Sequence, residues 1–219
     1  MPKAVEATRI MYKMSHSYRS VLRDPTSFIV TDVEVDGPDP GVHSMLSLAS
    51  VAVDHDGCEL GEFVVNLKPL EGARQDAGTM AWWESQPAAW QETTGSPQDP
   101  ATAIRAWTKW IADRPGKAVF VAHPISFDGA WVDWYLKRFV GARLFDRPRE
   151  PGVCGGAGLD IPSLVMASMG WDYRRCSREN YPAVWLGGHS HSHRAIDDAK
   201  GYAHLFSLLL TKRLPERLD

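Results

Sequence analysis

The sequence predicts an α/β fold in which a mixed central β-sheet is flanked by α-helices, and three observations lead to this prediction. Apolar segments with strand character come first along the chain, before any strong helical pattern. A short, wholly apolar segment over residues 118–122 then lies between two helical segments, as is typical of a strand buried on both faces. The last long segment carries an apolar stripe at helical spacing. Such elements bury their apolar surfaces by packing helices against a sheet.

Apolar and β-branched runs bounded by turn residues predict the strands. Residues 28–33 form the first, a buried strand that ends in acidic residues. Residues 45–53 and 63–67 lie on either side of an Asp-His-Asp-Gly turn at 54–57, so they predict a hairpin. Residues 118–122 predict a further strand that helices cover on both faces.

Spacing and capping residues predict the helices. Residues 79–91 hold several large apolar side chains and predict one short helix. Asp99 and Pro100 supply an N-cap and a first-turn proline, so a second helix is expected to begin there and to end before Pro115. Further helices are predicted over 128–139, 161–169 and 195–212, with irregular segments over 147–158 and 170–193.

Length and composition predict one folded domain behind an N-terminal extension. The chain has 219 residues, of which 44% are hydrophobic, enough for a real core. Residues 1–26 show little periodicity and end in an Asp-Pro break, so we predict a flexible extension there and a folded domain over 27–219. Nine tryptophans are many for this length, and several are expected to anchor the core or line a binding surface.

Several classes of protein are disfavoured by composition. Cys58, Cys154 and Cys176 have no paired spacing, which argues against a disulfide framework or zinc ribbon and favours a reducing cytoplasm. No apolar run approaches the ~18–20 residues of a membrane span, so no membrane partner is expected. No apolar leader segment is present near the N-terminus, which disfavours secretion.

Two acids close the first strand. Asp32 and Glu34 are two residues apart on an extended segment, so their side chains point to the same face. Two carboxylates at such a short distance raise each other's pKa unless a cation lies between them. A hard divalent cation, which binds oxygen ligands, would relieve the repulsion. The alternative is a solvated strand end, because Asp-x-Glu is a common pattern.

Two more acids and a histidine come from later segments. Asp128 follows the buried strand at 118–122 and could equally be a first-turn acid that interacts with the helix dipole. His193 and Asp198 precede and open the last helix; five residues span about 500°, so both can act at one site only if His193 lies in the entering loop. Asp197 points about 100° away from Asp198 and is the weaker candidate.

The alternating histidines His189, His191 and His193 allow a second interpretation. Such a run can bind a metal ion, but with Gly and Ser between the histidines it is more often a flexible loop. Both interpretations stay open at this point.

Three segments together resemble the motifs of the DnaQ-like, or DEDDh, 3′–5′ exonucleases. They are Asp32-Val33-Glu34, residues 123–128, and residues 193–199, the last of which fits the pattern His-x-Ala-x-x-Asp. They occur in the family's order, across residues 27–212. Each motif alone is weakly specific for the family, whereas the three motifs in this order are strongly specific for it. Residues 79–86, with Trp82 and Trp83, also resemble a Trp-Trp segment of a subgroup that includes exoribonucleases.

The resemblance implies a fold, a cofactor and roles for the residues. It implies an RNase H-like fold and two Mg²⁺ or Mn²⁺ ions, with Asp32, Glu34 and Asp198 as direct ligands. Asp128 would complete the shell of the second ion, partly through water, and His193 would be the general base. A base with a pKa near 6.5 can accept a proton from water at neutral pH. By the same resemblance, the residues expected to touch the substrate include Val35 and Phe127, next to the motif acids.

The sequence departs from the family pattern at two places. Val35-Asp36-Gly37 stands where Thr-Thr-Gly commonly follows the first motif, so the terminal nucleotide is expected to be recognised differently. Pro124 stands in the second motif where Asn or Ala is common. Neither change affects an implied metal ligand.

The implied partner is nucleic acid with a single-stranded 3′ end, RNA slightly favoured over DNA. The formal net charge of −3 argues against a protein that holds long nucleic acid by charge alone, so local contacts are needed. Arg174 and Arg175, in an aromatic-rich segment over residues 171–185, are the predicted contacts. The alternative is a solvated loop over core tryptophans.

Three further alternatives stay open. A catalytically inactive RNase H-fold module that binds nucleic acid would usually have lost one of the five site residues, and all five are present here. An endonuclease of RNase H or integrase type would not need His193 at this spacing. The sequence also allows a homodimer.

Overall fold

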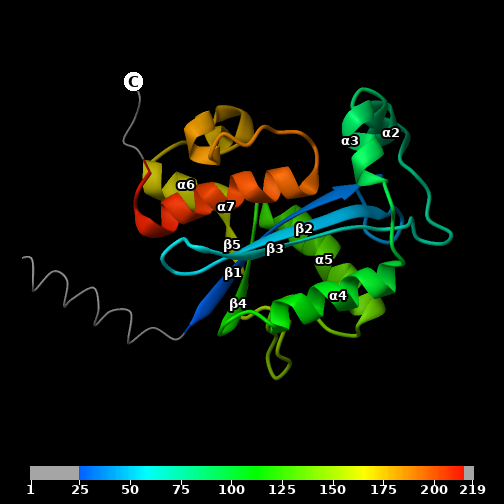
Figure 1. The fold of residues 1–219 in the computed structure, drawn as a ribbon, viewed down its shortest axis with the longest axis horizontal. Helices are drawn as coiled ribbons and strands as arrows, with labels where there is room; N and C mark the ends of the chain where they lie inside the picture. Colours follow the sequence, from blue (N-terminus) through cyan, green and yellow to red (C-terminus); the bar gives the residue numbers. More distant parts are fainter. Residues whose placement is uncertain (1–24, 215–219) are drawn as a thin grey trace, which may run out of the picture.

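Five strands form the mixed sheet that the sequence predicts. The computed structural model describes residues 25–214, and its strands lie in the order β3-β2-β1-β4-β5 (Figure 1). β1 pairs antiparallel with β2 and parallel with β4; β3 pairs antiparallel with β2, and β5 parallel with β4. The strands are β1 Thr26–Val35, β2 Met45–Val53, β3 Glu59–Asn66, β4 Lys117–Ala122 and β5 Leu159–Asp160.

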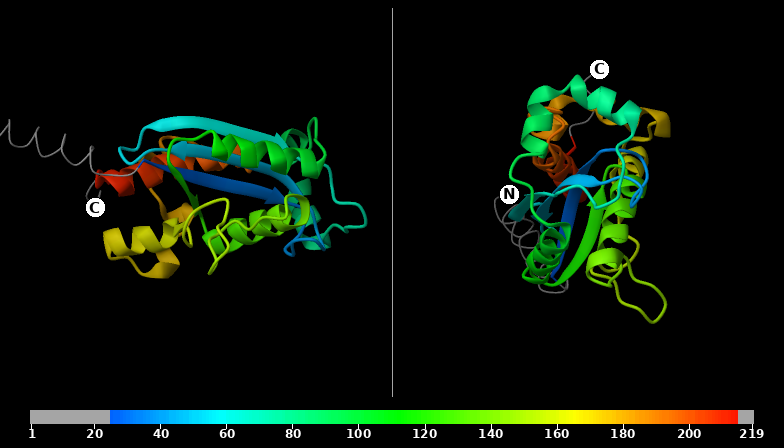
Figure 2. Two further views of the ribbon diagram at one scale, coloured as in Figure 1. Left: turned by 90° about the horizontal axis from the view of Figure 1, so that it is seen from below. Right: turned by 90° about the vertical axis from the view of Figure 1, so that its right-hand side faces the viewer.

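Helices cover both faces of the sheet. α4 and α5 lie on one face, and α6 and α7 on the other, while α2 and α3 sit over one end of the molecule (Figures 1 and 2). The helices are α2 Ala77–Glu84, α3 Pro87–Thr93, α4 Pro100–Ala112, α5 Ile125–Phe139, α6 Ile161–Met169 and α7 Ala195–Thr211. Three short 3-10 helices, η1 Tyr173–Arg175, η2 Arg178–Asn180 and η3 Ala183–Leu186, occupy the segment that was predicted to be irregular.

Alternation along β1 assigns its side chains to the two halves of the core. Ile29 and Val33 pack with α4 and α5, whereas Phe28 and Val30 pack with α6 and α7. Even-numbered side chains of this strand therefore face α7. The acids at positions 32 and 34 follow the same alternation, so the fold itself directs them toward α7.

The largest differences from the predicted bounds concern three places, each for a local reason. The single helix expected over 79–91 is two helices, because Pro87 lacks an N–H and begins a new helix as its first residue. α5 begins at Ile125, three residues before the predicted start, with Pro124 at its N-cap position. β3 begins at Glu59 because the turn closes early: the side chain of Asp54 accepts from the Cys58 N–H at 2.9 Å.

The predicted N-terminal extension, residues 1–26, lies outside the described residues except for its last two. Of these, Thr26 already belongs to β1. β5 was not predicted, because two residues are too few to display a pattern. Within residues 25–214, none of the helices is both long and apolar enough to cross a membrane.

Candidate metal centre and active site

The candidate site lies where the carboxyl end of β1 meets the first turns of α5 and α7. Parallel pairing between β1 and β4 ends at Val30 and Val121. Beyond this point β4 leads into α5, and β1 continues toward α2, paired only with β2 and beside the N-terminal end of α7 (Figure 1). Ligand sites of α/β sheets form at such places, where neighbouring strands end and their helices diverge.

Three predicted acids meet at this place. Asp32 and Glu34 of β1 and Asp198 of α7 each offer a carboxylate oxygen, and these oxygens lie within 4.8 Å of one another. Asp198 is only 1% exposed, whereas the two β1 acids are partly exposed at the mouth of the site. The predicted same-face arrangement of Asp32 and Glu34 therefore brings both toward the one acid that α7 supplies.

Asp128 is fixed beside this group by a backbone contact. It lies in the first turn of α5 and is 2% exposed. Its Oδ1 accepts a hydrogen bond from the Val33 N–H at 3.1 Å, so α5 is anchored between the two acids of β1. A role limited to the dipole of α5 does not explain why the side chain points to β1.

The cluster is electrostatically frustrated without a cation. Burial raises the pKa of Asp32 well above its usual range, and the negative charges of Asp128, Glu34 and Asp198 raise it further. Burial likewise raises the pKa of Glu34, as do Asp198 and Asp128. The pKa of Asp128 is raised by burial, against the effect of its hydrogen bond from Val33. A protein retains such a group when a bound cation favours the ionised form.

The donor set fits a hard divalent cation. The three converging groups are all carboxylates, the ligands that Mg²⁺ and Mn²⁺ prefer, and a fourth carboxylate lies beside them. Part of the cluster opens to solvent, as a site that also admits substrate requires.

His193 lies in the loop before α7, as predicted, with a backbone φ of 56° that a non-glycine residue seldom adopts. Its ring contacts the edge of the Trp82 ring, with centroids 4.7 Å apart, and lies 4.0 Å from the ring of His191. Burial and the neighbouring His191 lower the pKa of His193. The ring is therefore neutral at pH 7 and can accept a proton.

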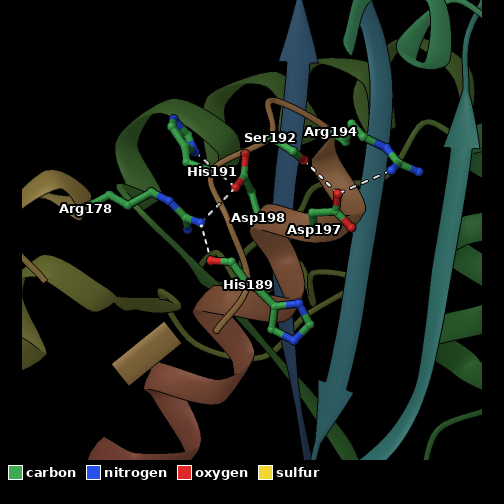
Figure 3. A network of polar contacts seen from close by, with 7 residues as sticks. All are labelled: Arg178, His189, His191, Ser192, Arg194, Asp197 and Asp198. Atoms are coloured by element: carbon green, nitrogen blue, oxygen red, sulfur yellow. Dashed lines mark hydrogen bonds and ion pairs between the residues drawn. The ribbon is translucent and has the colours of Figure 1, made fainter. Parts of the chain in front are cut away.

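The neighbouring acid of α7 has different partners. Asp197 accepts from the Ser192 hydroxyl at 2.7 Å and pairs with Arg194 at 3.5 Å, turned away from Asp198 (Figure 3). Arg194 also forms an ion pair with Glu92 of α3, and this pair connects the loop that holds His193 to α3. The side chain of Asp197 thus stabilises the loop and does not join the acids.

Sequence reasoning missed the role of Arg178. Its side chain is 6% exposed, and Nη2 lies 3.2 Å from Asp198 Oδ1 and donates to the His189 carbonyl at 3.3 Å (Figure 3). Its positive charge also acts on Asp32, whose pKa it lowers, opposite to the effect of the surrounding acids. Nη1 is buried without a hydrogen-bond partner. Arg178 is therefore the cation that the structure itself places among the acids.

α7 is shaped to receive this guanidinium. Asp198, Gly201 and Tyr202 are three and four residues apart and share a helical face. The guanidinium lies 5.1 Å from the centre of the Tyr202 ring, and a Cβ at position 201 would come within 3.3 Å of Nη1. The signal for this contact in the sequence is a glycine inside a helix, where it usually costs stability.

The predicted substrate-contacting residues fall into two groups. Val35 ends β1, and its carbonyl accepts a hydrogen bond from the Trp83 indole N–H at 2.9 Å. Phe127 immediately precedes Asp128, and 38% of it is exposed. Both are next to the acids. Arg174 and Arg175 are exposed on η1, with Arg175 stacked 4.9 Å from the Trp171 ring, and within residues 25–214 no hydrogen bond or ion pair joins them to the acidic cluster.

Comparisons with known proteins test the family resemblance. Residues 27–210 match the model of the 3′–5′ exoribonuclease Rv2179c-like domain. The 3′–5′ DNA exonuclease Cap18 of Escherichia coli is 27% identical over 208 residues, which cover 90% of this chain and 98% of that protein. These matches confirm the family resemblance that the three motifs predict.

Solved structures confirm the fold. The nuclease domain of 3′hExo, described as a DEDDh family member bound to rAMP, superposes with a TM-score of 0.58 at 10% identity, covering 87% of this chain and 94% of that one. An exonuclease I structure gives a TM-score of 0.58 at 15% identity and covers 87% of this chain and 41% of its own. The RNase H-like architecture is thus shared at low sequence identity.

Proposed function

The chain belongs to the Rv2179c-like family of 3′–5′ exoribonuclease domains, and from this membership we propose that it removes nucleotides from single-stranded 3′ ends with the help of two divalent cations, preferring RNA slightly over DNA. The observation that carries the proposal is the convergence of oxygens from Asp32, Glu34 and Asp198 within 4.8 Å, with Asp128 beside them. All four acids and His193 are present, which disfavours the alternative of an inactive binding module.

Each residue has a role in the proposed mechanism. Asp32, Glu34 and Asp198 would hold Mg²⁺ or Mn²⁺, and Asp128 would complete the shell of the second ion. When bound, two such ions activate a water molecule and stabilise the leaving 3′ oxygen of a phosphodiester. His193, neutral because its pKa is lowered, takes the proton of the attacking water on a ring nitrogen. Trp82 packs against that ring and fixes its orientation.

The preference for RNA is supported by the family description and by the Trp82-Trp83 segment. The relative Cap18 is a DNA exonuclease, so the two nucleic acids need a direct comparison. We suggest matched single-stranded RNA and DNA oligomers, each with a free or a blocked 3′ end, in Mg²⁺, in Mn²⁺ and in chelator. Stepwise release of mononucleotides from free 3′ ends, faster for RNA and absent in chelator, is the expected result.

Other outcomes of that experiment would change the proposal. Faster digestion of DNA would reverse the proposed preference. Internal cuts in blocked oligomers would indicate an endonuclease, and full activity in chelator would overturn the metal-dependent mechanism. Binding without cleavage would indicate an inactive module.

We propose a cytoplasmic location from the cysteines. Cys58, Cys154 and Cys176 are all free thiols, and two of them are buried where no second cysteine pairs with them. A chain with free buried thiols suits a reducing compartment. Burial raises the pKa of Cys154 to about 12, so this thiol is inert as a nucleophile.

His193→Ala is expected to lower kcat by about 10²–10⁴, the usual contribution of a general base, and to leave residual activity. Because the pKa of His193 is lowered, wild-type activity should fall only below the usual pKa of histidine, and the variant should lose this acidic limb. Rate-against-pH profiles of both proteins provide the measurement. A variant that keeps the wild-type profile would remove His193 from the mechanism.

Arg174→Ala/Arg175→Ala is expected to weaken binding of a single-stranded oligomer several-fold and to leave the melting temperature nearly unchanged. Both side chains are exposed, and an exposed cation–π contact such as Arg175 on Trp171 stabilises by only about 0.5–1 kcal/mol. The matched control is Arg105→Ala/Lys109→Ala, which removes the same charge from α4 on the other face of the sheet. If both double variants bind the oligomer with equal affinity, Arg174 and Arg175 do not contact the substrate and η1 has a structural role only.

A further inference from the structure

A second group of metal-binding atoms overlaps the acidic cluster. His191, His193 and Asp198 each offer one ligand atom, and the three atoms lie within 4.8 Å of one another. His191 Nδ1 lies 3.0 Å from Asp198 Oδ1, a separation that two ligands of one tetrahedral ion can adopt. Both histidines belong to the alternating run of the sequence, which the nuclease mechanism uses only through His193.

The geometry of the loop gathers these side chains. His193 has a positive φ, and its ring centroid lies 4.0 Å from that of His191. The His191 side chain is 43% exposed, so an ion and a water ligand can reach it. His189, the third member of the run, has its ring turned away from Asp198 and contributes only its carbonyl, to Arg178 (Figure 3).

The donor types separate this group from the carboxylate cluster. Two imidazoles and one carboxylate, with a fourth position open to water, suit Zn²⁺ and similar transition-metal ions, whereas Mg²⁺ prefers oxygen ligands. Arg178 lies 3.2 Å from the same Asp198 oxygen, which opposes a cation there. The positive charge of Arg178 is offset by the carboxylate of Asp32, whose pKa it lowers, and by Glu34, which lies near Asp32.

We propose that His191, His193 and Asp198 form an inhibitory site for Zn²⁺ or a similar transition-metal ion, and that its occupation switches off the nuclease. The inhibitory consequence rests on the proposed function, because it takes His193 as the general base and Asp198 as a ligand of the catalytic ions. An ion held here would bind a nitrogen of the His193 ring, which could then no longer serve as a free base. It would also compete with the catalytic ions for Asp198, which belongs to both groups.

Metal binding can be tested without any cleavage assay. Zn²⁺ is titrated into the full chain and followed by calorimetry, and Co²⁺ is titrated and followed by its visible absorption. Both titrations contain millimolar Mg²⁺, so that Mg²⁺ is available to the carboxylate cluster. We expect one Zn²⁺ per chain and a tetrahedral Co²⁺ spectrum. His191→Ala should weaken Zn²⁺ binding by at least about tenfold. Removing a residue that only supports a metal ligand already lowers metal affinity by about this factor. His189→Ala is the matched control and should bind like the wild type.

The second arm measures inhibition as the ratio of Mg²⁺-supported cleavage with and without Zn²⁺. Zn²⁺ should inhibit the wild type and His189→Ala at concentrations at least about tenfold below those needed for His191→Ala. Absence of Zn²⁺ binding to the wild type, or equal binding by His191→Ala, would overturn the site. Binding with equal inhibition of all three proteins would overturn the switch. If no variant cleaves nucleic acid in Mg²⁺, the proposed function fails, whereas the binding arm still decides whether the site exists.

Discussion

Replacing Asp32 with Asn is expected to abolish exonuclease activity and to raise the melting temperature of the metal-free protein. Activity should fall by at least about 10²-fold, the loss that follows removal of one group that stabilises a transition state. Stability should rise because burial and three neighbouring acids oppose the ionised form of Asp32 in the folded chain. Functional sites commonly combine such a gain in stability with a loss of function. Steady-state rates and thermal melting in chelator provide the two measurements.

The pH dependence gives this prediction a definite sign. A carboxyl group whose pKa is raised by folding stabilises the folded state below its unfolded pKa, about 3.9 for Asp, and this contribution is lost as pH rises through the raised folded pKa. The melting-temperature advantage of Asp32→Asn should therefore grow as pH rises through that window. Asp56→Asn, at an exposed turn, is the control and should show no growing advantage. An Asp32→Asn protein with wild-type activity would show that the site is misassigned.

Local pattern was sufficient to predict the part of the site that lies on one strand. Asp32 and Glu34 are on the same face of β1 because side chains of a strand alternate, and this holds whatever the strand packs against. The loop position of His193 followed from helical geometry once His193 was taken to share a site with Asp198. The bounds of β2 and α6 also agree with the prediction, because turn or capping residues mark their ends.

Contacts between distant segments were beyond such reasoning. The pairing of Arg178 with Asp198 depends on where η2 lies relative to α7, and most of the sequence between the two residues predicts no regular structure. Arg178 lies in the same aromatic-rich segment as Arg174 and Arg175, although it is buried and they are exposed. Burial of a charged residue follows from its tertiary partners, and a local window contains none of them.

Arg178→Met is expected to lower the free energy of unfolding of the metal-free protein by about 3–5 kcal/mol, as is usual when one partner of a buried ion pair is removed. Methionine retains most of the apolar stem but leaves Asp198, 1% exposed, beside Asp32 and Glu34 without a compensating cation. The loss is not expected to be screened by solvent, because the Arg178 side chain is only 6% exposed. Urea unfolding in chelator measures it.

Added Mg²⁺ separates this electrostatic loss from a loss of packing. A cation bound by the carboxylates takes over the positive charge that Arg178 supplied, so the stability difference between Arg178→Met and the wild type should narrow in Mg²⁺. Arg175→Met is the matched control: its guanidinium is exposed on η1 and loses only the cation–π contact with Trp171, so its stability should stay within about 1 kcal/mol of the wild type with or without Mg²⁺. An Arg178→Met protein as stable as the wild type in chelator would contradict the role of Arg178 as the internal cation of the site. A stability deficit that Mg²⁺ leaves unchanged would assign the arginine to packing against Tyr202 and Gly201 instead.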